Sequence, residues 1–304
     1  MTMDEEQQAR QGIIFALGAY LMWGIAPVYF KMIQTVSPVE IICHRILWSF
    51  LLLAGLIHFG KQWPTIRHLL SDRNKLYYLI ATSVLVGSNW LIFIWAINNN
   101  HLLDASLGYY INPLLNVILG MVFLNERLRK LQWIAVALAS VGVIIQLILF
   151  GSVPIIAISL AGTFGIYGLL RKKVMVSAQN GLFIETLLLV PVALIYLFGF
   201  ADSATSNLAE NSLHLNILLA MAGVVTTLPL LCFAGAATRM KLSTLGFFQY
   251  IGPSMMFILA VVFYGEPFSA DKATTFLFIW GALLVFSYDG LRHHRRRPAI
   301  AMAK

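Results

Sequence analysis

Long apolar runs alternate with short polar stretches along the whole chain. Ten runs are each about 18 to 23 residues long, the length that a helix needs to cross a hydrocarbon core about 30 Å thick. The pattern therefore predicts an all-α integral membrane protein. Its ten transmembrane helices are expected near residues 12–30, 39–59, 76–97, 103–124, 131–150, 153–171, 181–200, 213–234, 243–264 and 273–290.

The distribution of lysine and arginine predicts how these helices are oriented. If the N-terminus is cytoplasmic, 18 of the 21 cations fall on the cytoplasmic side, including the Arg171 to Lys173 cluster. Only Lys31 and Lys272 fall outside, and Arg45 lies within a helix. Because cytoplasmic loops carry the excess of positive charge, both termini are expected in the cytoplasm, with residues 291–304 as a basic cytoplasmic tail.

Composition supports a membrane protein. Hydrophobic residues make up 59% of the 304 positions and charged residues 11%, with a mean hydropathy of +0.80, whereas soluble domains carry about 25% charged residues. The net charge of +8 does not indicate a nucleic-acid partner, because the cations lie in short clusters between apolar runs. Cys43 and Cys232 lie within apolar runs and form no metal motif, so we expect no metal and no cofactor.

The two halves of the chain resemble each other at an offset of about 140 residues. PLLNVILGMVFLNE (113–126) aligns with PSMMFILAVVFYGE (253–266), and ASLGYYINP aligns with STLGFFQYIGP after a two-residue insertion. The repeats are expected at 12–150 and 153–290, with five helices each. Since five is odd, the second repeat should be inverted relative to the first, an arrangement that suits alternating access.

Several longer segments carry a family resemblance. They are YLMWGIAPVYFK, EIICHRILWSF, SLGYYINPLLNVILG, TTLPLLCF and TRMKLSTLGFFQYIGP, and they resemble the RarD family within the EamA-type drug/metabolite transporters. The resemblance implies a bacterial inner-membrane permease of two five-helix EamA units. Relatives in the superfamily export amino acids, other metabolites or drugs, so we expect a secondary active transporter that exports a small metabolite or drug, with the lipid bilayer as its surroundings.

The fourth and ninth predicted helices indicate a substrate site. Each has a proline in mid-run, Pro113 and Pro253, which removes a backbone hydrogen bond and is expected to break the helix there. Aromatic and amide residues within six positions of these prolines, most of them before the proline, are predicted to line a midplane cavity. They are Tyr109, Tyr110, Asn112, Asn116, Phe247, Phe248, Gln249 and Tyr250. The alternative is that the prolines only kink packed helices and the amides bridge neighbours.

Other residues extend this hypothesis. Trp23, Asn89 and Trp90 are further candidates for contact with substrate, whereas Trp95 is expected at the lipid interface. Six glycines are interpreted as positions of close helix packing rather than ligand contacts. They are Gly24, Gly87, Gly108, Gly120, Gly165 and Gly246.

The stretch EIICHRILWSF places three polar groups in an apolar run. Glu40 is interpreted as part of a capping box with Ser37. Arg45 keeps its charge and must find an anion, carbonyl groups or water, so it is a candidate for binding a substrate carboxylate. His44 and Glu185 correspond at an offset of 141 and are candidates for coupling transport to protons. A fixed buried network is the alternative for these groups.

Two other functions compete with the carrier. A membrane-embedded enzyme acting on a lipid or small molecule would need a reactive pair, and the His101 and Asp104 pair matches no spacing that supports one. A channel would need a filter sequence, and inverted halves suit a carrier better.

Overall fold

The computed structural model describes residues 3–99, 102–151, 153–203, 205, 207–263 and 270–301, and its regular elements are all helices within those ranges. The predicted His101 and the repeat residue Glu266 lie outside the described residues. The elements are α1 (Met3–Met32), α2 (Pro38–Phe59), α3 (Trp63–Ser71), α4 (Arg73–Asn98), α5 (Leu102–Leu124), α6 (Lys130–Phe150), α7 (Ile155–Val174), α8 (Ala178–Gly199), α9 (Leu213–Arg239), α10 (Leu242–Gln249), α11 (Ile251–Ile258), the π-helix η1 (Leu259–Phe263) and α12 (Ala270–Ala301).

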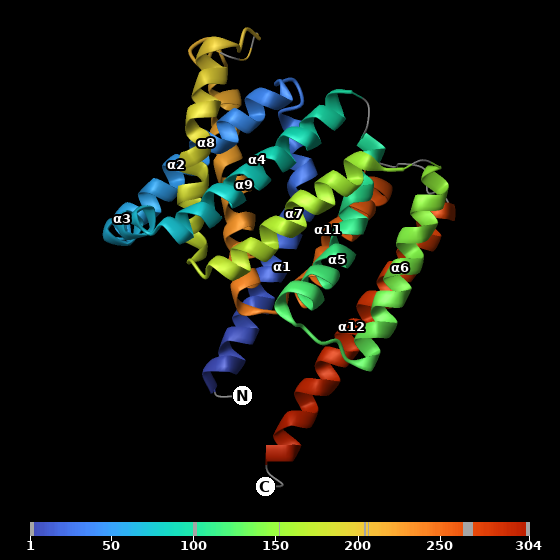
Figure 1. The fold of residues 1–304 in the computed structure, drawn as a ribbon. Coiled ribbons are helices and arrows are strands. Elements are labelled where there is room, and N and C mark those ends of the chain that lie inside the picture. The colour runs from blue at the N-terminus through green and yellow to red at the C-terminus, as the bar shows by residue number, and fades with distance from the viewer. Residues whose placement is uncertain are drawn as a thin grey trace.

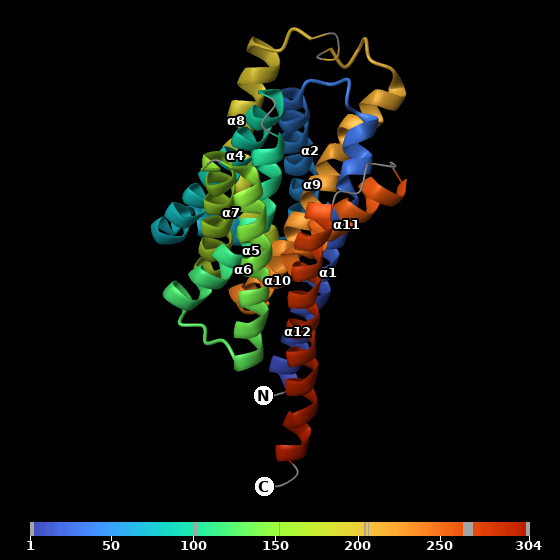
Figure 2. The same cartoon turned by 90° about the vertical axis from the view of Figure 1, so that its right-hand side faces the viewer.

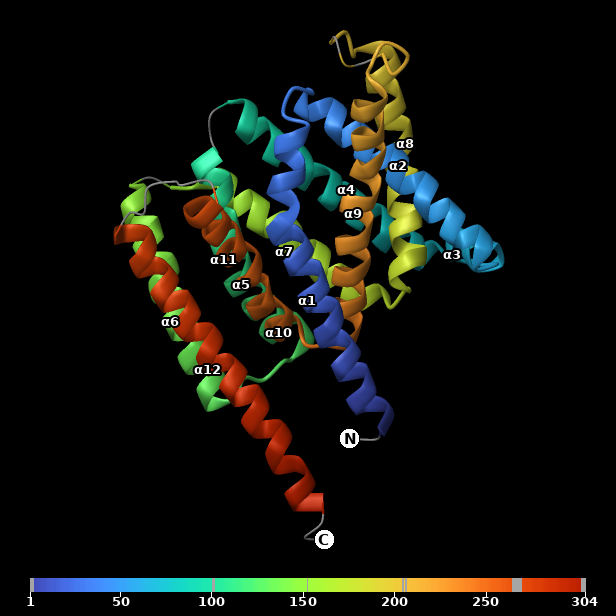
Figure 3. The ribbon, with the colours of Figure 1, turned by 180° about the vertical axis from the view of Figure 1, so that it is seen from behind.

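The helices form one bundle in which both ends of the chain lie at the same end (Figures 1 and 2). α6 and α12 pack together along one edge, and α2, α3 and α8 occupy the other (Figures 1 and 3). Between these edges α1 packs on α9 and α11, α7 packs on α4 and α5, and α5 also packs on α10. Segments from both halves of the chain therefore build the middle of the molecule.

The predicted number of membrane spans is confirmed. Within the described ranges, ten helical segments are long and apolar enough to cross a membrane, with α10, α11 and η1 counted together as the span Leu242–Phe263. Large apolar side chains such as Ile14, Val122 and Leu284 project from the outside of the bundle. Because these side chains would be costly in water, the chain is a multi-pass membrane protein.

The two mid-run prolines behave differently. α10 ends at Gln249 and α11 begins at Ile251, two residues before Pro253. The ring of a proline clashes with the carbonyl four residues earlier, which here belongs to Gln249, so the break follows from the sequence. α5 continues without interruption through Pro113, so the predicted break is wrong there. The second repeat has the two-residue insertion before its proline, and the first has none.

Glycines mark the close approaches between helices, as predicted. A Cβ atom added at Gly24 would lie 2.7 Å from the Cβ atom of Met255, and one at Gly246 would lie 2.7 Å from the carbonyl oxygen of Pro113. Gly87, Gly108, Gly120 and Gly165 have neighbours within 3.1 Å of such an atom. Small residues let helix backbones approach closely in a membrane, which explains these positions.

The capping box predicted at the start of α2 is not formed. The Ser37 side chain makes no capping bond although Ser37 is the N-cap of α2. Glu40 instead accepts a hydrogen bond of 2.9 Å from the Thr205 hydroxyl in the connection after α8, so it ties the first turn of α2 to that connection at the end opposite the termini. The loop after α2 contains the helix α3, whose Ile66 and Leu69 are buried. The predicted basic tail from residue 291 continues α12 as far as Ala301.

Candidate functional site

Arg45 lies in α2, seven residues after its first residue, Pro38. Its Nε donates a hydrogen bond of 2.7 Å to the Thr226 hydroxyl on α9. The guanidinium carbon lies 4.8 Å from the centre of the Trp90 ring on α4 and 5.7 Å from that of Phe30 on α1. Four helices thus meet at this cation, and aromatic rings supply the cation–π contacts that stabilise a charge away from water.

Close packing between α2 and α9 fixes the position of Arg45. A Cβ atom at Gly223 would lie 2.5 Å from the carbonyl carbon of Trp48, so the two backbones touch. The Ser49 hydroxyl donates to the Gly223 carbonyl at 3.2 Å, and the Thr226 hydroxyl donates to the Ala222 carbonyl at 2.7 Å. The Thr226 hydroxyl, which accepts from Arg45, is therefore fixed in position by its own hydrogen bond within α9.

A cluster of amide side chains joins α5 to α10. The Asn116 Nδ2 donates to Asn112 Oδ1 at 2.9 Å and to Gln249 Oε1 at 3.1 Å, and Asn112 Nδ2 donates to the Ala161 carbonyl on α7 at 3.2 Å. All three amides are buried, and Asn116 Oδ1 has no protein partner. The bridging predicted as the alternative is thus present, and the cluster retains an acceptor for water or a ligand.

An aromatic cluster fills the middle of the bundle between the two halves. The Trp23 ring centre lies 5.6 Å from Tyr20, 5.9 Å from Phe164 and 5.9 Å from Phe233. The hydroxyl of the buried Tyr20 has no partner. Phe248 packs against the same cluster. Trp23 and Phe164 are 141 residues apart and so correspond at the offset of the repeat, and their rings therefore touch across the boundary between the halves.

The remaining predicted aromatic residues occupy different places. The Tyr109 ring lies 6.2 Å from Phe93, and its side chain is 38% exposed. Tyr250 is fully buried and donates to the Tyr110 carbonyl at 3.2 Å. Phe247 stacks on Phe286 of α12 at 4.1 Å. Tyr109 is thus reachable from the surface of the bundle, whereas Tyr250 and Phe247 pack in the core shared by α5, α6, α10 and α12.

Asn89 ties α4 to α7. Its Nδ2 donates to the Leu160 carbonyl and to the Thr163 hydroxyl, both at 2.9 Å. Trp90, the next residue, packs against apolar clusters on α2 and α8 as well as over Arg45. Both residues therefore hold helices together. Their predicted contact with substrate would be a second role.

Glu185 belongs to a buried ionic network. It accepts hydrogen bonds from the Thr82 hydroxyl at 2.6 Å and the Tyr167 hydroxyl at 3.2 Å, and Arg171 Nη1 lies 3.4 Å away. Glu185 is 1% exposed and Arg171 0%. Arg171, the last residue of the span predicted at 153–171 and one of the cations assigned to the cytoplasmic side, is buried inside the bundle in the last turn of α7. The sequence placed it beside Lys172 and Lys173, which obscured its burial.

His44 faces away from Arg45. Its side chain is buried beside the apolar cluster of Ile42, Cys43 and Ile46, and Nε2 has no hydrogen-bond partner. A buried polar atom without a partner costs about 1 to 3 kcal/mol. A proton or a water molecule that reached Nε2 would remove this cost, so His44 is a group that could respond to protons.

Several residues at the site were not predicted from the sequence. Thr226 and Phe30 contact Arg45, and neither has a motif that would single it out. The Tyr29 ring lies 5.2 Å from that of Phe30, and its hydroxyl donates to the Leu218 carbonyl at 2.7 Å. The sequence signal that could have found Thr226 is its place in TTLPLLCF, a segment of the family resemblance.

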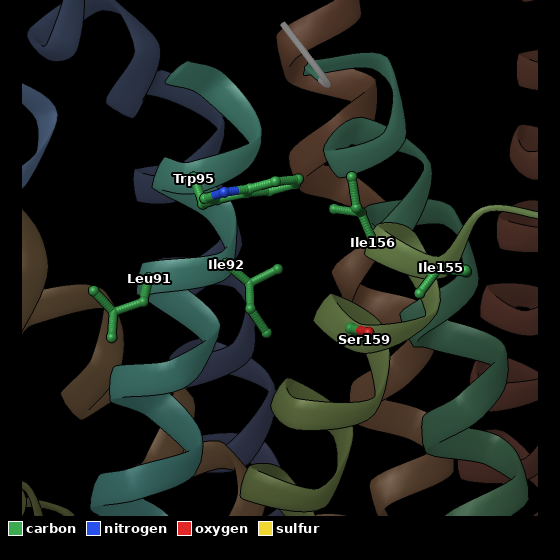
Figure 4. Close-up of a pocket in the computed structure, with 6 residues that line it drawn as sticks. All are labelled: Leu91, Ile92, Trp95, Ile155, Ile156 and Ser159. Carbon is green, nitrogen blue, oxygen red and sulfur yellow. The ribbon is translucent and has the colours of Figure 1, made fainter. Parts of the chain in front are cut away.

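A groove of about 300 Å³ lies on the surface between α4 and α7 (Figure 4). Leu91, Ile92 and Trp95 of α4 line it with Ile155, Ile156 and Ser159 of α7. Figure 4 shows Trp95 extending from α4 toward Ile156. Trp95 is 53% exposed, in keeping with its predicted place at the lipid interface. The groove contains none of the predicted substrate residues.

No three His, Cys, Asp or Glu side chains come together as metal ligands in the described part of the chain. Cys43 and Cys232 are free thiols. The chemistry of the site thus comes from one arginine, amides, hydroxyls and aromatic rings. Such groups bind and orient small molecules, because they donate hydrogen bonds and offer apolar surface.

Comparison with known proteins shows what the chain is similar to. Residues 10–148 match the EamA-like transporter family. An uncharacterized transporter of Vibrio cholerae serotype O1 is 64% identical over 98% of this chain and 99% of its own length. Protein RarD of Salmonella typhimurium is 57% identical over 96% of this chain and 100% of its own. A solved crystal structure of a protein at 16% identity matches the fold with a TM-score of 0.73, covering 91% of this chain and 97% of that one.

Proposed function

The chain belongs to the RarD group of the EamA-like transporter family, and from this premise we propose that it is a secondary active transporter that exports a small metabolite or drug. Its bacterial relatives are named transporters or RarD over nearly the whole chain, so it is a membrane transporter. The export direction, the bacterial inner membrane as its location and an alternating-access mechanism belong to the proposal.

The pairing of helices carries the mechanism. α1 packs on α9 as α7 packs on α4, and α5 packs on α7 as α11 packs on α1. α2 with α8, α5 with α10 and α6 with α12 are pairs of equivalent helices. If each transmembrane segment is replaced by the equivalent segment of the other repeat, five spans away in the order of the chain, the same pairs of helices remain in contact. The pattern supports two repeats, 12–150 and 153–290. The odd number of helices in each repeat implies inversion, and the cations of the connecting segments favour termini in the cytoplasm.

Separate polar contacts close the two ends of the bundle. At the end that holds the termini, Glu126 accepts from the backbone N–H groups of Leu242 and Ser243 at 2.7 and 2.9 Å. At the opposite end, Tyr29 binds the Leu218 carbonyl and Glu40 binds Thr205. Alternating access requires that these two sets of contacts open in turn.

The substrate is proposed to bind between the two ends. Arg45 and Trp90 would hold its polar part, and the amide cluster would contact it from α5 and α10. The support is the spare hydrogen-bonding capacity there: Asn116 Oδ1 is buried without a partner, and so is the nearby Tyr20 hydroxyl. A carrier needs polar groups that a substrate can complete, because such groups give specificity.

Proton coupling through His44 or Glu185 remains a proposal. Glu185 is linked to Arg171, Tyr167 and Thr82, so a change in its charge would be felt on α4 and α7 at once. His44 Nε2 has no partner. At least one of the variants His44→Gln and Glu185→Gln should flatten the dependence of transport on an imposed pH gradient. An unchanged pH dependence in both variants would disprove coupling through these residues.

Reconstitution into liposomes tests the proposed function. Liposomes with and without the protein are loaded with a mixed pool of metabolites and amphenicol drugs, and the compounds lost over time are identified. Loss of one class that saturates with concentration, and is accelerated by the same compound on the far side, would establish a carrier. Flux that does not saturate would favour a channel, and chemical conversion without flux would favour an enzyme.

A further inference from the structure

Two of the arginines within the membrane spans differ in their surroundings: Arg171 is fully buried, and Arg45 is half-buried. Arg171 has a carboxylate at 3.4 Å, from Glu185, and its Nη2 also donates to the Ala178 carbonyl at 3.3 Å. Arg45 has no carboxylate within ion-pair distance among the residues that the structure describes. A charge within a membrane is retained only where it is paired, hydrated or functional. Arg171 has a structural explanation, and Arg45 lacks one.

The orientation of Arg45 leaves one edge of its guanidinium free. Nε is engaged by Thr226, and the rings of Trp90 and Phe30 lie near the cation. Both Nη atoms are at least partly accessible. Neither donates a hydrogen bond to a protein group that the structure describes. The two Nη groups form the planar pair of donors that binds both oxygens of a carboxylate.

The charge balance restricts what can bind there. One guanidinium neutralises one negative charge, so a monoanion leaves a neutral complex within the membrane, where an uncompensated charge is costly. An amino acid zwitterion would add an ammonium group, and no described carboxylate lies close to Arg45 to receive it. A phosphate dianion would leave a negative charge unpaired.

Aromatic side chains surround the free edge. The ring centres of Phe30 and Trp90 lie 5.7 and 4.8 Å from the guanidinium carbon of Arg45, and the Tyr29 ring lies 5.2 Å from that of Phe30. Aromatic rings contribute large apolar contact areas, and a tyrosine adds a hydroxyl that can donate. The surroundings therefore suit a ligand with an apolar or flat body.

From these contacts we propose that Arg45 is the anion-binding end of the substrate site and that the substrate is a small organic monocarboxylate with an apolar body. The inference rests on the proposed transport function and names the substrate class. It also excludes zwitterionic amino acids as the preferred substrates. Thr226 acts as a positioning residue, because it fixes the guanidinium through Nε.

The test is ligand-dependent thermal stabilisation of the purified full-length protein in detergent. Three probes share one carbon skeleton: 3-phenylpropionate is a monocarboxylate, 3-phenylpropanamide is its neutral amide, and phenylalanine adds an ammonium group. Inorganic phosphate is the fourth probe. A ligand that binds only the folded protein raises its melting temperature with concentration. Stabilisation by 3-phenylpropionate at concentrations at least about tenfold lower than those of the other three is expected.

Variants connect this binding to Arg45. Arg45→Gln should weaken the binding of 3-phenylpropionate about tenfold or more, and Arg45→Lys should restore it only in part, because lysine keeps the charge and loses the planar pair of donors. Arg239→Gln is the matched control, since Arg239 also lies over an aromatic ring, Phe15 at 5.2 Å, at the far end of α9. It should bind 3-phenylpropionate as the unmodified protein does. All variants are first shown to be monodisperse by size-exclusion chromatography.

Defined results would overturn the proposal. Equal stabilisation by the amide or by phenylalanine would disprove the monocarboxylate class, and equal stabilisation by phosphate would indicate a general anion site. Undiminished binding in Arg45→Gln, or no stabilisation by the monocarboxylate at millimolar concentration, would disprove the role of Arg45. Failure of the proposed function looks different: 3-phenylpropionate would bind through Arg45 while liposomes showed no flux of any compound.

Discussion

A single methyl group at Gly181 should break the buried ion pair between Arg171 and Glu185. Gly181 lies in the first turn of α8, where the guanidinium of Arg171 passes directly over it. A Cβ atom at this position would lie 2.7 Å from Cζ of Arg171 and 2.9 Å from Nη2, and closer still to Nη1. Since Arg171 is fully buried, the side chain can avoid the methyl group only by leaving its partners.

The expected magnitude follows from two opposing effects. Alanine favours a helix over glycine by about 1 kcal/mol. Separating a buried ion pair costs about 3 to 5 kcal/mol, because it leaves uncompensated charge in the interior. Gly181→Ala should therefore destabilise the protein by roughly 2 to 4 kcal/mol, which corresponds to a drop in melting temperature on the order of 10 °C.

Thermal unfolding in detergent, followed by circular dichroism or by the appearance of aggregates, measures this effect. Gly162→Ala on α7 is the matched control, because a Cβ atom there meets nothing within 4 Å, and it should be neutral or slightly stabilising. A second variant isolates the cause: in an Arg171→Met background the penalty of Gly181→Ala should largely disappear. Equal melting temperatures for the two alanine variants, or an undiminished penalty in the methionine background, would refute the reasoning.

Two further predictions concern polar contacts between helices. Glu126→Gln should lower the free energy of unfolding by about 1 to 3 kcal/mol. The carboxylate accepts hydrogen bonds from two backbone N–H groups and the Ser243 hydroxyl at the start of α10, and an amide has only one oxygen that can accept. Chemical denaturation would measure the change, and a gain in stability would contradict this role. Asn116→Leu should cost about 1 to 3 kcal/mol as well, since it leaves two buried amide oxygens without their donor; a melting temperature unchanged from that of the unmodified protein would show that water replaces the lost bonds.

The comparison of sequence and structure shows which kinds of residue could be interpreted in advance. Glycines predicted as close-packing positions were confirmed, because in a membrane the absence of a side chain has few other uses. The burial of Arg171 was not predicted, since its neighbours are Lys172 and Lys173 and nothing local signals that a cation is buried. Glu40 has the spacing of a capping box and instead binds Thr205, 165 residues away.

The same contrast applies to the two repeats. Their correspondence predicted a break at each of the two prolines, and α10 ends before Pro253 while α5 continues through Pro113. The two-residue insertion precedes only Pro253. Equivalent prolines in a repeat thus have different effects, because the backbone around each one and the helices packed against it decide whether a lost hydrogen bond ends the helix.

The sequence by itself determined the number of membrane spans and the family. Both depend on local properties, since a bilayer of fixed thickness requires a fixed length of apolar helix and a motif is read directly along the chain. Only the tertiary structure decided the partners of the polar groups within the spans. Arg45 meets Thr226, which lies 181 residues further along the chain, and Glu185 meets Thr82 at a separation of 103. Such pairs arise from the way that whole helices pack, and no short stretch of sequence specifies them.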